Sequence, residues 1–299
     1  MQVVFPYPLD FRLFPDIYEY INILQRRGVD AKYIGWSLKG ESIISFVKSI
    51  VNHIRTINPD IVHVFHFRGS GLLPLIVKNK RIKWVIDIRT VHVQSSRFQT
   101  DRYFKVKDRV TWLEAQMYNY IFVLDSYLKS KFQPSLRPMA IVPLGGSWER
   151  FDPRMRDGIR SQVRAELGVP GDAVVLLYSG SLSPTRRVDV IVEAFARACR
   201  LWARDNVRMI IAGGVRGNAE MSKKAINELI SLAQAEGIGE KVVFTGHRPY
   251  DEACQFYHAA DIGISYLPPQ SAYAYQPPTK IIEYMMAGLL VVSNKTPGV

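Results

Sequence analysis

Two charged residues, Lys280 and Glu283, interrupt an otherwise apolar stretch near the C-terminal end of the chain. They are three positions apart, so on a helix they share one face. A carboxylate on a largely apolar helix needs polar partners, and a lysine in the first turn opposes the helix dipole. A ligand that carries both hydroxyl groups and negative charge would satisfy both side chains. A Lys280–Glu283 pair on an exposed helix edge would satisfy them equally well.

A turn rich in glycine, serine and arginine follows an apolar run in the second half of the chain. Gly180 and Ser181 allow close approach of the backbone, and Arg186 and Arg187 come where the next helix should begin. Arginines at a helix N-terminus are electrostatically misplaced unless an anion lies there too. A diphosphate meets this requirement. The alternative is a pair of solvated arginines.

Two further turns follow apolar runs and could face the same ligand. The first contains Gly213 and Gly214, and the second contains His247 and Arg248, where the backbone could face a nucleotide base. Ligands of parallel α/β sheets bind at the carboxyl ends of the strands, beside helix N-termini. The three turns would therefore line one site. His247 is predicted to be a loop residue rather than a catalyst.

The elements that would position these turns alternate between strands and helices. Apolar runs predict strands at 3–5, 31–36, 60–67, 84–88, 120–124, 139–144, 173–178, 208–212, 242–245, 262–267 and 289–292. Helix-like stretches lie at 15–27, 43–57, 188–202, 219–235, 250–258 and 279–287, the last with Thr279 as its N-cap and Gly288 at its end. Residues 145–172 break the pattern and predict a linker with a helix at 157–167. This alternation favours parallel sheets covered on both faces. We predict an α/β fold of two doubly wound, Rossmann-like domains, 1–150 and 151–299, that face a cleft.

Composition and missing motifs exclude several classes of protein. No apolar run approaches the roughly 20 residues that span a bilayer, and residues 1–5 resemble a strand rather than a signal peptide. The two cysteines, Cys199 and Cys254, predict core thiols rather than a disulfide framework or a metal cluster. No dinucleotide fingerprint, P-loop, metalloprotease motif or nucleophile elbow is present, which argues against a dehydrogenase, a kinase, a metalloprotease and an α/β-hydrolase.

The positive charge is concentrated in the first half of the chain. Of the formal net charge of +12, residues 1–150 contribute +10, from 22 Lys and Arg against 12 Asp and Glu. A basic first half predicts an acidic partner, which could be anionic lipid, nucleic acid or a phosphorylated substrate. Residues 97–112 interleave basic and aromatic side chains. This segment suits an anionic membrane surface and would equally suit a solvated basic loop.

The second half resembles the donor-binding domain of the GT-B glycosyltransferases and is most similar to glycosyltransferase family 4. The matching stretches, in family order, are 177–194, 210–214, 242–246, 257–262 and 280–292. The first half matches more loosely, at 59–64, 142–146 and 151–153. The resemblance covers the whole chain and is strongest after about residue 170.

The resemblance implies a retaining glycosyltransferase that moves a sugar from a nucleotide-sugar donor, a UDP- or GDP-sugar, to an acceptor. By that resemblance Glu283 accepts hydrogen bonds from the ribose hydroxyls, and Arg187 binds the diphosphate. The turns at 213–214 and 247–248 line the donor pocket and the base. No metal and no other cofactor is expected, because positive side chains and helix N-termini stabilise the departing diphosphate.

The predicted site therefore has a donor part and a catalytic part. The predicted donor-binding residues are Gly180, Ser181, Arg186, Arg187, Gly213, Gly214, His247, Arg248, Lys280 and Glu283. The predicted catalytic residues are His92, Arg187 and Lys280. His92 follows a strand of the first domain and is chosen as the histidine that contacts the transferred sugar or the acceptor. His63 lies within a strand and is predicted to be a core residue, while Asp87 and Arg89 could form a structural pair.

Three departures from the family pattern stand out. Ser181 occupies the position of a usual arginine, which puts diphosphate stabilisation in doubt unless Arg186 compensates. Tyr275 occupies the position of a frequent acidic residue, eight places before Glu283. The chain stops at Val299, so by the resemblance the second domain lacks its last helices.

Several alternatives stay open. One is a catalytically silent GT-B protein that binds a nucleotide or an assembly partner, and another is a nucleotide-sugar epimerase of the same architecture. A basic nucleic-acid-binding protein is disfavoured, because no RNA- or DNA-binding signature is present. We expect a cytoplasmic protein that could be peripheral at the membrane, and we hypothesise a lipid-linked or membrane-borne acceptor.

Overall fold

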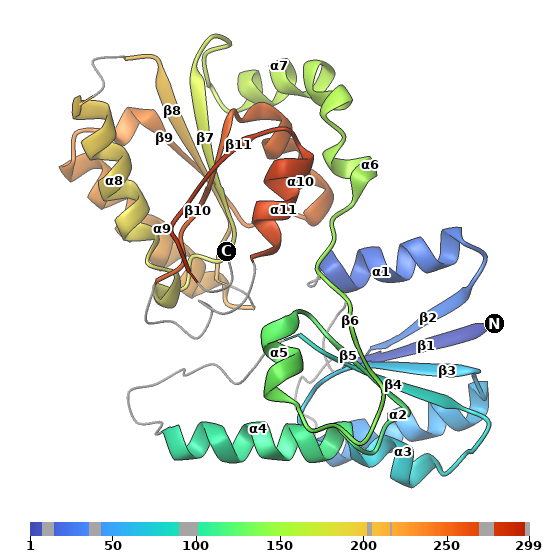
Figure 1. Ribbon diagram of the computed structural model, residues 1–299. Coiled ribbons are helices and arrows are strands. Elements are labelled where there is room, and N and C mark those ends of the chain that lie inside the picture. Colours follow the sequence, from blue (N-terminus) through green and yellow to red (C-terminus); the bar gives the residue numbers. More distant parts are fainter. Residues whose placement is uncertain are drawn as a thin grey trace. The chain divides into compact units, whose positions relative to one another are not determined.

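The computed structural model describes residues 1–7, 15–35, 43–89, 101–201, 205–215, 217–268 and 278–296. These residues form two compact units, Met1–Leu144 (unit 1) and Gly145–Val299 (unit 2). Each unit contains one parallel sheet with helices on both faces (Figure 1). The predicted α/β class, with two doubly wound parallel-sheet units, is confirmed.

Unit 1 has a six-stranded sheet in the order β2-β1-β3-β4-β5-β6. Its strands are β1 (Gln2–Tyr7), β2 (Asp30–Gly35), β3 (Ile61–Phe65), β4 (Lys83–Ile88), β5 (Tyr120–Val123) and β6 (Met139–Ile141). Its helices are α1 (Pro15–Arg26), α2 (Ile43–Ile57), α3 (Leu72–Val77), α4 (Asp101–Ala115) and α5 (Ser126–Lys131). All pairings are parallel, so the carboxyl ends of the strands share one edge.

Unit 2 has a five-stranded sheet in the order β11-β10-β7-β8-β9. Its strands are β7 (Val174–Ser179), β8 (Val207–Ala212), β9 (Val242–Gly246), β10 (Ile262–Ser265) and β11 (Leu290–Ser293). Its helices are α6 (Trp148–Phe151), α7 (Arg156–Glu166), α8 (Val188–Leu201), α9 (Ala219–Ala235), α10 (Tyr250–Ala259) and α11 (Thr279–Met286). These pairings are also parallel.

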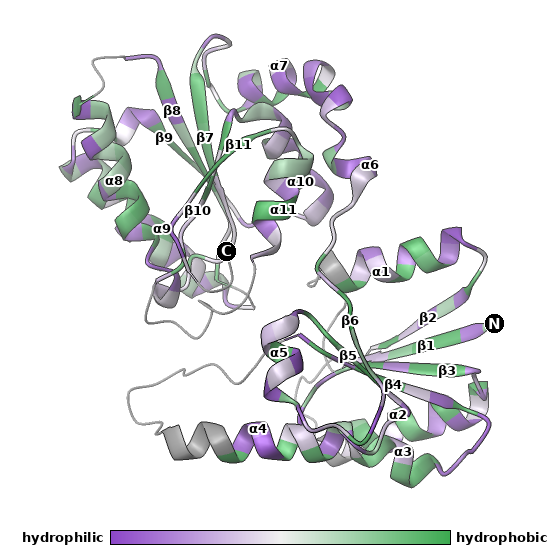
Figure 2. Ribbon diagram, in the orientation of Figure 1, coloured by the Kyte–Doolittle hydropathy of each residue, from purple (hydrophilic) through white to green (hydrophobic). Residues whose placement is uncertain are grey.

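The cores explain why the strands read as continuous apolar runs. In unit 1 one cluster packs α2, α3 and α5 against the sheet, and a smaller cluster packs α1 against its other face. In unit 2 one cluster holds α8 and α9, and the other holds α7, α10 and α11. A parallel strand covered on both faces needs apolar residues in both directions. Figure 2 shows the hydrophobic residues concentrated along the strands and the inward sides of the helices.

The helix that carries Lys280 ends as predicted but begins differently. Gly288, at φ 73°, provides the left-handed end of α11, as predicted. The residue before the helix is Pro278, and it makes no side-chain cap hydrogen bond. Thr279 is already the first residue of the helix, so its prediction as the N-cap is wrong.

Other differences concern boundaries and short helices. The segment 97–112 is helical from residue 101, so the alternative of a loop is wrong there, and residues 97–100 lie outside the described part. The short helices α3 and α5 were not predicted. Both cysteines are free thiols that pack in or against the core of unit 2, as expected.

Candidate functional site

Three loops meet at the carboxyl edge of the unit 2 sheet, and they are the three turns that the sequence singled out. The Gly180 N–H donates to the carbonyl oxygen of Ala212 at 2.9 Å, and the Gly213 N–H donates to that of Gly246 at 3.0 Å. The Leu182 N–H donates to the carbonyl oxygen of Gly214 at 3.0 Å. Backbone hydrogen bonds therefore join the ends of β7, β8 and β9 into one surface.

The close crossing of two of these loops requires glycine. Gly213 has φ 145°, and a Cβ atom there would lie 1.8 Å from the carbonyl oxygen of Gly180. Gly180 has φ 153°, and a Cβ atom there would lie 2.9 Å from Nζ of Lys280. The absent side chain at Gly180 therefore leaves the space in which the lysine ammonium lies.

Lys280 reaches from the first turn of α11 to the loop after β7. Its Nζ lies 4.0 Å from the centre of the Tyr178 ring, a distance at which an aromatic face attracts a cation. The Tyr178 hydroxyl donates to the carbonyl oxygen of Ser181 at 2.9 Å, which ties the ring to the same loop. Burial lowers the pKa of Lys280 to about 7, with a further lowering by Arg186 and an opposing effect of Glu283. A bound anion would restore the charge of this ammonium.

Glu283 lies one helical turn further along and is only 8% exposed. The hydroxyl of Tyr257, a buried residue of α10, donates to its Oε2 at 2.7 Å. Burial and the neighbouring carboxylate of Glu283 raise the pKa of Tyr257, so the hydroxyl keeps its proton. Glu283 is thus a buried acceptor held in a fixed orientation, as a carboxylate that binds hydroxyl groups must be.

Tyr284 fixes the helix from which both residues extend. Its hydroxyl accepts from the Ser179 N–H at 3.0 Å and donates to the carbonyl oxygen of Leu177 at 3.2 Å. A Cβ atom at Gly263 in β10 would lie 2.3 Å from its ring. The ring therefore lies directly on the sheet, and α11 has one position relative to the end of β7.

The two arginines after the loop behave differently. Arg187 has φ 49° and extends to Asp189, with its Nε 2.9 and 3.0 Å from the two carboxylate oxygens. Its side chain is 55% exposed. Arg186 is half-buried and close enough to Lys280 to lower the pKa of that lysine. In this structure Arg186 belongs to the positive cluster at Gly180, and the binding of a diphosphate by Arg187 stays a prediction.

The remaining predicted donor-binding residues lie around the same edge. Ser181 Oγ accepts from the Ser183 N–H at 3.2 Å and closes the turn. His247 is exposed, and its Cβ atom lies 3.4 Å from the place of a Cβ atom on Gly214. Arg248 is also exposed, with its Nη1 3.6 Å from Oε2 of Glu252.

Ser222 of α9 was not predicted. Its Oγ accepts from the Val215 N–H at 2.7 Å and donates to backbone carbonyls, so it fixes the loop that follows Gly214. A Cβ atom on Gly214 would lie 2.9 Å from this oxygen. A serine in the first turn of a helix after a glycine pair is the signal that could have indicated it.

In unit 1 the predicted catalytic residue His92 lies outside the described residues, as does Tyr275 in unit 2. His63 is buried in β3 with its Nε2 3.4 Å from Asp87 Oδ2, so it is a core residue as predicted. Asp87 Oδ2 also accepts from the Arg89 guanidinium at 3.1 and 3.2 Å. Asp87 and Arg89 are therefore the structural pair that the sequence left open.

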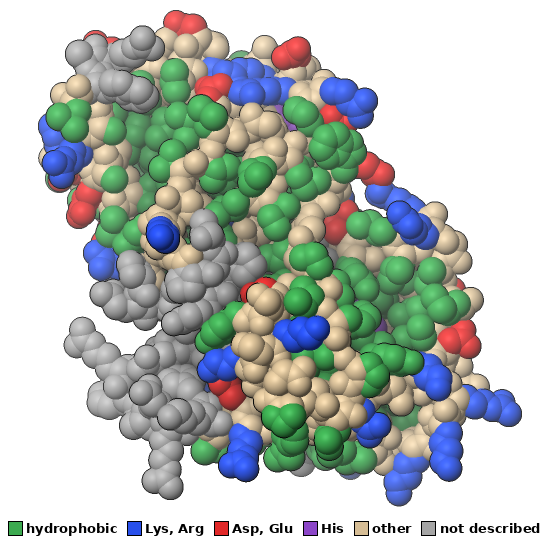
Figure 3. All heavy atoms as spheres, in the orientation of Figure 1, with side chains coloured by type: hydrophobic (Ala, Val, Ile, Leu, Met, Phe, Trp, Pro, Cys, Tyr) green, Lys and Arg blue, Asp and Glu red, His purple; other side chains and the backbone are tan. Residues whose placement is uncertain are grey.

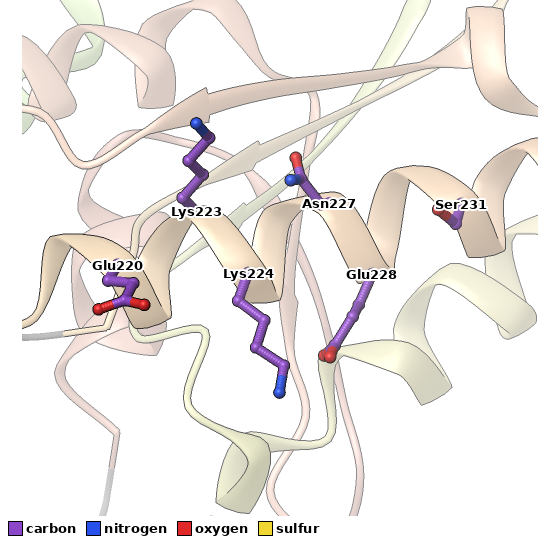
Figure 4. Close-up of a pocket in the computed structure, with 6 residues that line it drawn as sticks. All are labelled: Glu220, Lys223, Lys224, Asn227, Glu228 and Ser231. Atoms are coloured by element: carbon purple, nitrogen blue, oxygen red, sulfur yellow. The ribbon is translucent and has the colours of Figure 1, made fainter.

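A hollow of about 560 Å³ lies along one face of α9 (Figure 4). Its lining residues are Glu220, Lys223, Lys224, Asn227, Glu228 and Ser231. All six come from one helix and are exposed, with charges of both signs. The hollow is an ordinary helix surface, and two of its residues provide matched controls below.

No group of three or more His, Cys, Asp and Glu side chains in the described ranges is placed to hold a metal ion. No helix among the described residues is long and apolar enough to cross a membrane.

Comparison with known proteins agrees with this geometry. Residues 159–299 match the family model described as "Glycosyl transferases group 1". The chain is 29% identical over 181 residues to the lipopolysaccharide 1,2-N-acetylglucosaminetransferase of Salmonella typhimurium, covering 60% of this chain and 45% of that protein. It is 36% identical over 123 residues to the D-inositol 3-phosphate glycosyltransferase of Nocardia farcinica, covering 41% and 26%. The chain thus spans less than half the length of these curated relatives.

Solved structures resemble the whole chain. Anabaena Alr3699/HepE in complex with UDP and glucose has a TM-score of 0.70 at 16% identity, covering 100% of this chain and 82% of that one. WaaG, a glycosyltransferase involved in lipopolysaccharide biosynthesis, has a TM-score of 0.67 at 18% identity, covering 99% and 82%. Residues 159–299 therefore resemble the glycosyl transferases group 1 family, and the described fold is that of the GT-B glycosyltransferases.

Proposed function

We propose that this protein is a retaining, metal-independent glycosyltransferase that moves a sugar from a UDP- or GDP-sugar to an acceptor. The observation that carries the proposal is that α11 presents an ammonium and a buried carboxylate one helical turn apart. Lys280 places its ammonium at the Gly180 loop, and Glu283 holds a buried carboxylate one turn away. A nucleoside diphosphate has the matching parts, with an anionic diphosphate beside ribose hydroxyls.

The site would stabilise the leaving group with its own charges. The diphosphate would lie against the Gly180–Ser181 loop, where Lys280 and Arg186 would face it and Arg187 directly precedes α8. Preorganised positive groups at the place where charge develops are usually the largest contribution to such a reaction. These side chains could fill the role that a metal ion has elsewhere, which supports a metal-independent mechanism. Retention of configuration rests on the family resemblance.

The donor is expected to be a UDP-sugar rather than a GDP-sugar. The related structure of Anabaena Alr3699/HepE contains UDP and glucose, and the Salmonella relative is named for N-acetylglucosamine transfer. The base would lie near His247 and Arg248, beside the loop that follows β9. The predicted role of His92 toward the transferred sugar or the acceptor remains part of the proposal.

Calorimetric titration with UDP, GDP and ADP tests the donor site. We expect UDP to bind, and binding to weaken at least about tenfold in Glu283→Gln and in Lys280→Met, since each loses charge-assisted hydrogen bonds. The controls are Glu228→Gln and Lys224→Met on the exposed face of α9 (Figure 4). Equal losses in the control variants, or binding of none of the three nucleotides, would contradict the proposal. UDP binding without transfer or hydrolysis of any UDP-sugar would favour the catalytically silent alternative.

A membrane-borne acceptor is supported by an exposed apolar surface on unit 1. Four residues of α4 and its C-terminal end lie at helical spacing on one face, and three exposed residues of α3 add to them. The apolar surface consists of Leu72, Leu75, Ile76, Val106, Val110, Leu113 and Met117. The two helices are neighbours, because a Cβ atom on Gly71 would lie 2.8 Å from Glu114. Exposed apolar patches on a soluble domain mark interaction sites.

Charge around this apolar surface favours anionic lipid as the partner. Lys78, Lys80 and Arg81 are exposed just after α3, and Arg109 is exposed on α4. Figure 3 shows Lys and Arg side chains spread among hydrophobic ones on the visible face of unit 1. A helix with an apolar stripe and basic neighbours binds at the level of the lipid headgroups. The protein would then be cytoplasmic and peripheral at the membrane, facing a lipid-linked acceptor.

Co-sedimentation with liposomes tests the membrane contact. We expect binding to vesicles of phosphatidylglycerol and phosphatidylcholine at low salt, and a loss of about tenfold in Leu75→Glu and Leu113→Glu. Leu201→Glu, at an exposed leucine of unit 2, is the matched control. The membrane proposal fails if the intact protein ignores anionic vesicles, or if the control loses as much binding.

A further inference from the structure

A histidine and a carboxylate form a close pair at the carboxyl end of β3. His66 Nε2 lies 2.9 Å from Oε2 of Glu114, and the N–H of Gly69 donates to the other oxygen, Oε1, at 2.8 Å. The two side chains are 14% and 15% exposed. Both carboxylate oxygens are engaged, so Glu114 is held in place by the loop after β3 as well as by the imidazole.

The pair determines which nitrogen of His66 carries the hydrogen. An ionised carboxylate only accepts, so Nε2 donates, and a neutral imidazole then presents Nδ1 as a lone-pair acceptor. Among the described residues no hydrogen bond to Nδ1 is found. The His66 side chain is 14% exposed, so part of the ring reaches solvent.

The contrast with the other histidine of the same strand is informative. His63 is almost fully buried and surrounded by the rings of Phe5, Tyr20 and Phe65. Its contact with Asp87 is longer, at 3.4 Å. His63 therefore contributes to the core, whereas His66 has a short contact to a carboxylate and a second nitrogen with no hydrogen bond among the described residues.

The backbone places His66 where a ligand would be expected. Its N–H donates to the carbonyl oxygen of Asp87 at 2.9 Å, so it continues the sheet just past the end of β3. The chain then turns at Gly69, with φ 88°, into α3. Ligands of doubly wound sheets bind outside the carboxyl ends of the strands. An acceptor nitrogen here is suited to a hydroxyl group.

We propose that Nδ1 of His66 accepts a hydrogen bond from a hydroxyl of the sugar or polyol acceptor, and that Glu114 is a positioning residue that fixes the tautomer. This inference rests on the proposed glycosyltransferase function and assigns part of its acceptor site to unit 1. It invokes no proton transfer. The competing role is purely structural, with the pair bracing the loop of residues 66–71.

Nuclear magnetic resonance of the histidine ring nitrogens in the full chain tests the tautomer. The spectrum of the neutral imidazole is expected to show Nε2 protonated and Nδ1 unprotonated, and Glu114→Gln is expected to populate the other tautomer. Titration with myo-inositol, a ring of hydroxyl groups, should shift the Nδ1 resonance of His66 and leave that of the exposed His53 unchanged. A protonated Nδ1, or no shift at saturating myo-inositol, overturns the inference.

Kinetics separate acceptor binding from a structural role. With UDP-N-acetylglucosamine as donor, His66→Ala is expected to raise the KM for myo-inositol or D-inositol 3-phosphate about tenfold, the contribution of one hydrogen bond. The KM for the donor and the rate of donor hydrolysis by water should stay as in the wild type. His53→Ala should leave the KM values for donor and acceptor unchanged. Equal effects on donor and acceptor would indicate a structural role and overturn the inference. If UDP neither binds nor is released, the proposed function fails, and the tautomer and titration results still decide the role of His66.

Discussion

The hydroxyl of Tyr257 lies 2.7 Å from Oε2 of Glu283, and both side chains are buried between α10 and α11. The two residues are 26 positions apart in the chain. Because the hydroxyl keeps its proton, it always donates, and the carboxylate has one orientation toward the carboxyl edge of the sheet. Tyr257 is therefore a positioning residue for the proposed ribose acceptor.

Tyr257→Phe removes this hydrogen bond and keeps the ring. We expect UDP affinity to fall about fivefold to tenfold, and the free energy of unfolding to fall by about 1–3 kcal/mol, since a buried carboxylate oxygen loses its partner. Calorimetry with UDP and with 2′-deoxy-UDP and 3′-deoxy-UDP checks the cause. The loss should be smaller for the deoxy analogue that lacks the hydroxyl bound by Glu283. Equal losses for all three nucleotides would show that Tyr257 does not act through a ribose hydroxyl.

Lys280 should make donor binding depend on pH. Its pKa of about 7 means that the ammonium is only partly charged at neutral pH, and a bound diphosphate would raise this pKa. UDP-glucose affinity is therefore expected to fall as pH rises from 6.5 to 8.5, with proton uptake on binding near pH 7.5. Calorimetry in buffers of different ionisation enthalpy measures the uptake. Lys280→Arg should bind with little pH dependence, and an unchanged pH profile in this variant would contradict the assignment.

The lowered pKa of Lys280 also affects the stability of the unliganded protein. Between pH 7 and the ordinary lysine value of 10.5, the unfolded chain holds more protons than the folded one. The free energy of unfolding contributed by Lys280 therefore rises with pH across this window, and it is lowest below pH 7. Urea unfolding of wild type and Lys280→Met at pH 6.5 and 9 should show the variant gaining more at the lower pH. An equal difference at both values would mean that Lys280 keeps an ordinary pKa in the folded state.

Much of the fold was predictable because its signals are local. The strands of both sheets are apolar runs, and helix-like stretches alternate with them, so the parallel arrangement follows. The helices α3 and α5 were missed because each has only six residues, too few for a clear periodicity. The helix α4 was not recognised because its apolar stripe is exposed and its other residues are largely charged.

The site was predictable only where its residues are close in sequence. Lys280 and Glu283 share one helix, and the glycines of the three loops follow strands. Glu283 is contacted by Tyr257, which lies 26 positions away in the chain, and His66 is contacted by Glu114, which lies 48 positions away. Both partners come from other helices. No spacing rule reveals such contacts. Nor could the sequence tell that Arg187 would extend to Asp189, because that depends on its left-handed backbone.

Gly213→Ala should disrupt the crossing of the loops after β7 and β8. The new Cβ atom would lie 1.8 Å from the Gly180 carbonyl oxygen, so the backbone must move. Gly237→Ala is the matched control, since Gly237 also has a positive φ of 73° but meets no atom within 4 Å. We expect the control to lose about 1 kcal/mol of unfolding free energy and Gly213→Ala about 2 kcal/mol more. Urea unfolding measures both, and UDP binding should be lost only in Gly213→Ala. Equal effects of the two substitutions would show that the crossing adds nothing beyond backbone strain.

Asp261 should be important for stability and unimportant for donor binding. Its Oδ1 accepts from Arg156 at 2.7 Å and from Arg160 at 2.9 Å, and its Oδ2 accepts from the buried Arg164 at 3.0 Å. Asp261→Asn leaves three guanidinium groups of α7 without their counter-charge. Breaking a buried ion pair costs about 3–5 kcal/mol, and partial exposure of Asp261 reduces this to an expected loss of about 2–3 kcal/mol.

The position of Asp261 separates its effect on stability from any effect on donor binding. Its Oδ2 also accepts from the N–H of Val175, at the start of β7, which is the opposite end of that strand from Gly180. The affinity of the folded variant for UDP should therefore equal that of wild type, although its unfolding midpoint in urea is lower. Asp205→Asn, at an exposed aspartate paired only with Lys241 at 3.4 Å among the described residues, should change stability by less than about 0.5 kcal/mol. A loss of UDP affinity in Asp261→Asn would mean that the amino edge of the sheet is linked to the donor site, and the two ends of β7 could no longer be treated as independent.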